Sequence, residues 1–104
     1  MIYTVKNMDS KFAFPRRLKL YLKDNTFRKA KSIEPNSSDC IYIVNQWYWS
    51  GYWQKPYKVL KKEFYYDKRT NKKKFKNVTV LWIDGTKSTH CTSLDPRRDY
   101  KLYK

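Results

Sequence analysis

The sequence predicts an all-β fold, because one hairpin pattern occurs twice along the chain. In both copies apolar residues alternate with others, at residues 18–22 and 78–82, as a strand with one buried face requires. Asp24-Asn25 and Asp84-Gly85 follow the two runs, and such residues tolerate the positive φ of a tight turn. The tetrapeptides Ser-Ile-Glu-Pro and Ser-Leu-Asp-Pro then close the copies. The pattern indicates a small barrel whose buried residues are Leu18, Leu20, Leu22, Val78, Val80 and Trp82.

The second copy carries a resemblance to a known family. V-x-V-x-W-x-D-G-T followed by Ser-Leu-Asp-Pro, at residues 78–96, is similar to the central hairpin of SH3-like barrels of the Tudor, KOW and chromatin-reader kind. A weaker echo lies at residues 18–35. The resemblance implies an SH3-like β-barrel, a scaffold that usually binds rather than catalyses. The chain departs from the pattern in its few glycines, an aromatic-rich insert and an extra basic hairpin.

The remaining elements of the N-terminal half follow from composition. We expect a short strand at residues 2–5 and a loop at residues 7–17, with Phe12 and Phe14 anchoring that loop to the core. Residues 40–44 are predicted as a strand, because β-branched and aromatic residues dominate them.

The C-terminal half contains the basic hairpin. Residues 59–67 and 74–83 are predicted as two long strands joined by a tip at residues 68–73. A helical turn at residues 59–64 is the alternative. Residues 97–104 are expected to add a last edge strand, whose lysines would discourage pairing between edges.

An aromatic stretch at residues 45–57 separates these halves. Six of its thirteen residues are Trp or Tyr. Alternation predicts that Trp47 and Trp49 point inward, whereas the Tyr row points outward. Three interpretations stay open: a core that replaces missing aliphatic bulk, a platform for bases, or a cage for methylated side chains of the kind that the resemblance implies. The candidate contact residues are Tyr48, Tyr52 and Trp53.

Charge is the main indication of a partner. The chain forms one domain, residues 1–104, with 24 basic and nine acidic residues and a net charge of +15. Such a surface attracts nucleic acid, an acidic protein or anionic lipid. The alternative is a solvated surface without a specific partner.

Two basic clusters are the candidate phosphate contacts. The first, at the hairpin tip, is Lys68, Arg69, Lys72, Lys73, Lys74 and Lys76. The second is Arg16, Arg17, Lys19, Lys23, Arg28, Lys29 and Lys31. The tip could equally be an exposed turn kept solvated by its lysines.

Other classes of function find little support. No apolar run has the length of a membrane span, and the N-terminus lacks the pattern of a signal peptide. Cys40 and Cys91 form no disulfide framework, although one bond between them stays open, and together with His90 they fall short of a structural zinc site. No nucleophile lies near a His–acid pair, and no glycine-rich phosphate loop occurs. We expect no enzyme, no cofactor and no metal.

The sequence therefore favours a cytoplasmic nucleic-acid-binding protein, associated with the nucleoid if it binds DNA. Binding is expected through Lys and Arg with little sequence preference, and DNA is favoured over RNA. The alternative is a small interaction or inhibitor protein that docks on an acidic partner protein through an aromatic patch. The abundance of Lys, Asn and Tyr favours an AT-rich genome of a bacterium or a bacteriophage.

Overall fold

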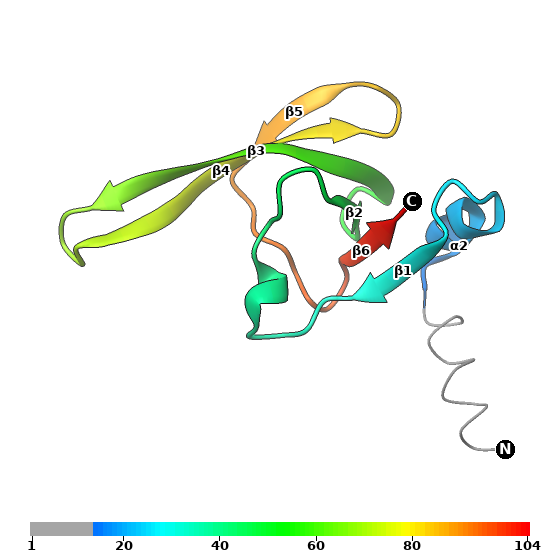
Figure 1. The fold of residues 1–104 in the computed structure, drawn as a ribbon, viewed down its shortest axis with the longest axis horizontal. Coiled ribbons are helices and arrows are strands. Elements are labelled where there is room, and N and C mark those ends of the chain that lie inside the picture. Colours follow the sequence, from blue (N-terminus) through cyan, green and yellow to red (C-terminus); the bar gives the residue numbers. More distant parts are fainter. Residues whose placement is uncertain (1–13) are drawn as a thin grey trace, which may run out of the picture.

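A computed structural model describes residues 14–104 as a strand-rich fold with one α-helix, which confirms the all-β class (Figure 1). The elements, in chain order, are helix α2 (Arg16–Lys23), strand β1 (Lys29–Ser32), the 3-10 turn η1 (Ser38–Cys40), and strands β2 (Trp47–Ser50), β3 (Lys55–Asp67), β4 (Lys72–Trp82), β5 (Lys87–His90) and β6 (Tyr100–Tyr103).

The six strands form one antiparallel sheet in the order β1-β6-β2-β3-β4-β5, and the sheet curls into a half-barrel. Strands β1 and β5 are its edges. The expected edge strand at residues 97–104 is therefore wrong in position, because β6 pairs with β1 on one side and β2 on the other. Leu102, at the centre of β6, is buried.

The first predicted hairpin is wrong, because its leading strand is helix α2. The helix begins directly after Pro15, whose carbonyl accepts from the Lys19 amide at 3.0 Å. Leu18 is 0% exposed, whereas Leu20 is 54% exposed. The buried side thus follows helical spacing, with Tyr21 and Leu22 packing beside Leu18.

The second predicted hairpin is confirmed as β4 and β5. Val78, Val80 and Trp82 are all buried, as expected. Gly85 has φ of +93°, and the Trp82 amide donates to the Thr86 carbonyl at 2.8 Å. The motif therefore forms the tight turn for which its residues are suited.

The core consists of two apolar clusters, and strand β2 contributes to both. Tyr48 belongs to a cluster with Tyr42, Tyr57 and neighbouring residues of β3 and β4. Trp49 points to the opposite face and packs with residues of α2, the α2–β1 turn and β6. Both faces of β2 are covered as a result.

The predicted strand at residues 40–44 is wrong. Cys40 ends the 3-10 turn, and the following segment pairs with no strand. Its backbone bonds to local turns and to side chains instead: the Ile41 amide donates to the Ser38 carbonyl at 3.1 Å, and the Ile43 amide donates to Tyr48 Oη at 3.0 Å. Only Tyr42 is buried there, and its hydroxyl donates to the Thr92 carbonyl at 3.1 Å.

The two long strands of the basic hairpin are confirmed as β3 and β4, so no helical turn forms at residues 59–64. Phe14 packs edge-on against Tyr100, with ring centroids 5.1 Å apart, as the anchoring role requires. Phe12, the strand at residues 2–5 and most of the loop at 7–17 lie outside the described residues.

Candidate nucleic-acid interface

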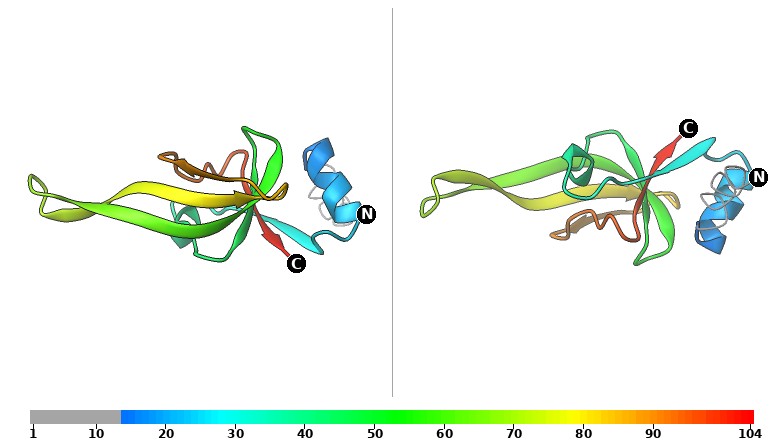
Figure 2. Two further views of the ribbon diagram at one scale, coloured as in Figure 1. Left: turned by 90° about the horizontal axis from the view of Figure 1, so that it is seen from above. Right: turned by 90° about the horizontal axis from the view of Figure 1, so that it is seen from below.

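The outer part of the β3–β4 hairpin, residues 63–77, extends beyond the rest of the sheet, and we call it the arm (Figures 1 and 2). Strand β5 pairs with β4 only from Val78 to Leu81. The arm is therefore a two-stranded ribbon without a third strand beside it. It gives the molecule its length in principal-axis extents of 54 × 33 × 20 Å.

The arm carries the first predicted basic cluster. Six of its fifteen residues are basic and two are acidic, and all six basic residues are exposed. Lys74 Nζ lies 3.0 Å from Asp67 Oδ2, and the hydrogen bond from Lys74 lowers the pKa of that carboxyl. Asp67 Oδ1 also accepts from the Arg69 amide at 2.9 Å, which shapes the turn. Lys74 is thus engaged inside the arm.

Exposed aromatic side chains accompany the lysines. Phe64, Tyr65 and Tyr66 are all exposed. The register places Tyr66 opposite Lys73 and Phe64 opposite Phe75, and Lys73 Nζ lies 5.1 Å from the centroid of the Phe64 ring. Tyr65 points to the other face and lies opposite Lys74, so each face of the ribbon presents aromatic and cationic groups together. The sequence reasoning missed these exposed aromatic side chains. Three consecutive aromatic residues in a predicted hairpin could have indicated them, because a two-stranded ribbon cannot bury both of its faces.

The second predicted cluster lies at the opposite end of the molecule, on and beside α2 (Figure 2). Lys19 is partly buried. The exposed members are Arg16, Arg17, Lys23, Arg28, Lys29 and Lys31. The structure therefore separates the two clusters along the long axis.

Of the three predicted aromatic contact residues, the structure buries one and exposes two. Tyr48 is wrong as a contact residue because it is 0% exposed. Tyr52 and Trp53 lie in the turn between β2 and β3 and are 66% and 42% exposed. Their rings touch edge-on, with centroids 4.9 Å apart.

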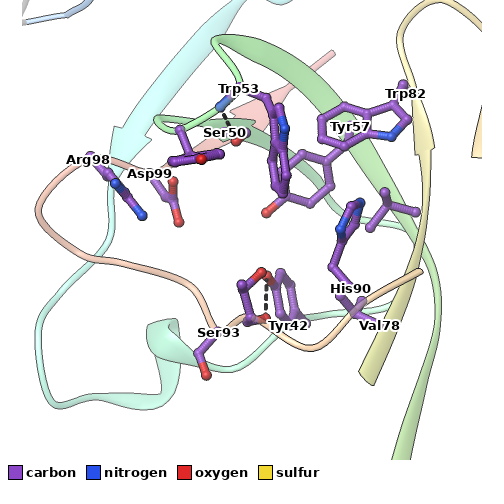
Figure 3. Close-up of a pocket in the computed structure, with 13 residues that line it drawn as sticks. Tyr42, Ser50, Trp53, Tyr57, Val78, Trp82, His90, Ser93, Arg98 and Asp99 are labelled. Carbon is purple, nitrogen blue, oxygen red and sulfur yellow. Dashed lines mark hydrogen bonds between the residues drawn. The ribbon is translucent and has the colours of Figure 1, made fainter. Parts of the chain in front are cut away.

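Trp53 also forms part of a pocket of about 330 Å³, here called the aromatic pocket (Figure 3). Figure 3 shows side chains from several segments around one open space. Its lining includes the aromatic, basic and acidic side chains of Tyr42, Trp53, Tyr57, His90, Arg98 and Asp99.

Backbone amides fix the position of Asp99, the carboxylate of the aromatic pocket. Asp99 Oδ1 accepts from the Gly51 amide at 2.9 Å, and Oδ2 accepts from the Asp95 amide at 2.7 Å. Burial raises the pKa of the Asp99 carboxyl. Gly51 is required at this close approach, because a Cβ there would collide with the Arg98 carbonyl.

His90 is held on the other wall. Its Nε2 shares a 2.6 Å hydrogen bond with Ser88 Oγ, and Ser88 Oγ accepts a second one from Trp82 Nε1 at 2.6 Å. The centroids of the His90 and Trp53 rings lie 4.7 Å apart. Burial lowers the pKa of the imidazole. Sequence reasoning considered His90 as a zinc ligand, which it rejected, and missed its part in the pocket.

Two further observations concern residues 14–104. Cys40 and Cys91 are both free, and no group of three His, Cys, Asp or Glu side chains in that range could hold a metal ion. The one α-helix described there is too short and polar to cross a membrane.

Comparison with known proteins gives no relative: no family model, curated protein or solved structure matches the chain.

Proposed function

We propose that this protein binds nucleic acid through the arm, with little sequence preference and with DNA favoured over RNA. The observation that carries the proposal is the arm itself, a projecting ribbon on which six exposed basic residues are interleaved with exposed aromatic rings. Basic side chains contact phosphates irrespective of sequence. We propose a binding protein rather than an enzyme, acting in the cytoplasm and at the nucleoid.

Groove dimensions support DNA as the partner. The major groove of B-form DNA is about 12 Å wide and admits a two-stranded β-ribbon. The major groove of A-form RNA is too deep and narrow for such an element. Inside a groove, the lysines at the tip would reach phosphates on both sides, and Tyr65 and Tyr66 would contact sugars and base edges.

The cluster on and beside α2 offers a second contact. A duplex along the 54 Å axis of the molecule would be followed for at most about 16 base pairs, at 3.4 Å each. We also propose that the β4–β5 hairpin, which carries the sequence motif, is the counterpart of the central hairpin of SH3-like barrels.

The test is a salt titration of binding to a random-sequence duplex, followed by fluorescence anisotropy. Binding should weaken steeply with salt, with a slope of about −0.9 per phosphate neutralised. A variant with Lys68, Lys72 and Lys73 changed to Gln should reduce the slope by up to about three units. Lys74 is kept, because its ion pair with Asp67 belongs to the turn.

A control variant loses the same charge elsewhere, at Lys61, Lys87 and Lys104, which are exposed outside the arm. It should keep most of the slope. Absence of binding at low salt would end the proposal, and equal losses in both variants would remove the arm as the interface.

A second candidate function is docking on an acidic partner protein, and the exposed pair of Tyr52 and Trp53 favours it. Arg98 lies over the Tyr52 ring, 5.4 Å from its centroid, and adds a cation to the same patch. Aromatic and Arg side chains are enriched among interface hot spots. A partner that is captured from lysate after nuclease treatment, and is lost with Tyr52→Ala, would favour this function.

A further inference from the structure

The aromatic pocket has no part in contacts made by the arm, yet it is built like a binding site. Its volume of about 330 Å³ lies at the lower end of the range for ligand pockets, which suits one small ring system. The ring of Trp53 is partly exposed and forms one wall, so a ligand reaches the pocket from solvent. Tyr42 and Tyr57 add further aromatic surface (Figure 3).

The polar groups of the pocket determine which hydrogen-bonding groups a bound ring must carry. Asp99 and the Tyr57 hydroxyl point toward the open space in Figure 3. Each Asp99 oxygen already accepts one backbone N–H, and a carboxylate oxygen has a second lone pair for a further donor. The pocket thus suits a planar ring that carries N–H or amino donors at its edge.

The charge around the pocket distinguishes a neutral ring from an organic cation. Arg98 lines the pocket, and the whole chain carries +15, so a free cation is repelled from this surface. A neutral ring attached to an anionic chain is attracted instead. A nucleobase within a nucleic acid has both properties.

We propose that the aromatic pocket accepts one unpaired nucleobase, and that Arg98 contacts the phosphate beside it. Trp53 supplies the stacking surface, and Asp99 accepts from the edge of the base. Arg98 now lies 3.3 Å from Asp95 Oδ2, but its guanidinium has five N–H donors and can serve a phosphate as well. The inference rests on the proposed nucleic-acid function, to which it adds a preference for unpaired positions.

The experiment compares three DNA duplexes of one sequence: fully paired, with a single unpaired nucleotide, and with an abasic unit at that unpaired position. The unpaired base should tighten binding by about 5- to 150-fold, the range expected for one stacked base. The abasic duplex should bind like the paired one. Trp53→Ala should abolish the preference and leave the affinity for the paired duplex and its salt slope unchanged.

Neighbouring arginines supply a matched control. Arg98→Gln should reduce the preference, whereas Arg97→Gln should not, because Arg97 does not line the pocket. The NMR resonance of the Trp53 indole N–H in the unaltered protein gives a measurement that does not depend on a variant folding, and it is distinct from those of the other three tryptophans. It should shift with the unpaired base and not with the abasic duplex.

The outcomes separate the two proposals. If no duplex binds, the proposed function itself fails. If paired and unpaired duplexes bind equally, or if the abasic duplex binds as well as the one with the base, the pocket does not hold a base and the inference is overturned.

Discussion

Lys101 Nζ donates a 2.7 Å hydrogen bond to Asp39 Oδ1 and thereby ties the interior strand β6 to the 3-10 turn η1. The two side chains are only 10% and 21% exposed. The hydrogen bond from Lys101 lowers the pKa of Asp39, and Asp39 in turn raises the pKa of Lys101. In a chain with a large excess of positive charge, this pair gives a nearly buried ammonium its counter-charge.

The first prediction concerns the acid stability that this pair confers. The pKa of Asp39 in the folded protein lies below its ordinary value of 3.8, so the contribution is complete above that pH and is lost as the pH falls through the lowered pKa. Asp39→Asn should therefore reduce the free energy of unfolding near neutral pH and reduce it less at acid pH, as the carboxyl of the unaltered protein becomes protonated. Urea denaturation across this range measures the difference.

Asp24→Asn is the control for that series, because Asp24 is an exposed acid at the end of α2. Its substitution should have little effect at either pH. A loss of stability by Asp39→Asn that is the same at both ends of the range would contradict the role given to its charge.

The second prediction concerns alkaline pH. Burial is the main cause that raises the pKa of Tyr48 from 10.0 to about 12. The folded state therefore favours the neutral phenol, and the corresponding stability is complete below pH 10 and lost as the pH rises from 10 toward 12. Unfolding monitored by circular dichroism should show a decline in this window that is smaller in Tyr48→Phe. An unchanged decline in that variant would exclude Tyr48 as its source.

The third prediction uses two leucines to test the helix. Leu18→Ala should cost about 2–5 kcal/mol, because Leu18 is fully buried. Leu20→Ala should stay within about 0.5 kcal/mol, because Leu20 is exposed. Denaturant titration distinguishes this result from the equal losses that a strand would give.

These leucines also explain where sequence reasoning succeeded and failed. The run Leu18, Leu20, Leu22 fits period two, but Leu18, Tyr21 and Leu22 fit helical spacing equally, and the two readings cannot be separated by pattern alone. The β-branched residues of Val78 to Val80 carry no such ambiguity. The strand there was predictable because local propensity and tertiary packing agree.

The candidate site was predictable only where it depends on local chemistry. The basic tip followed from composition, because the lysines of a protruding turn remain exposed. Tyr48 was placed outside because alternation assumes one open face, whereas both faces of β2 are covered. Trp49 packs with α2, and Tyr48 packs with Tyr42 and Tyr57 on the other face. The aromatic pocket joins Trp53, His90 and Asp99 from three distant segments, which no local pattern connects.

The fourth prediction contrasts two glycines. Gly51→Ala should cost about 1–3 kcal/mol through overpacking against Arg98 and should shift the indole signal of Trp53 beside the pocket. Gly85→Ala should cost about 1–2 kcal/mol for a different reason, since a Cβ has open space there but φ is positive. It should leave the Trp53 signal unchanged. A Trp53 shift in both variants would show that the signal does not report on the pocket.

The fifth prediction concerns the arm in the free protein. Amides of residues 63–77 should exchange with solvent faster than hydrogen-bonded amides of Val59 and Val80, because a ribbon without a third strand opens locally without unfolding the sheet. Hydrogen exchange followed by NMR measures both sets. Equal protection would mean that the arm and the sheet open as one unit.

Because the arm joins the rest of the fold only at its base, the length of the ribbon can change without altering that fold. Adding two residues to each strand would extend the ribbon by about 7 Å and return every side chain to its original face. Neither the packing around Trp49 nor the turn at Gly85 would have to change. The span of the contact can thus be matched to a different partner by insertions at the tip, with the rest of the fold acting as a fixed handle.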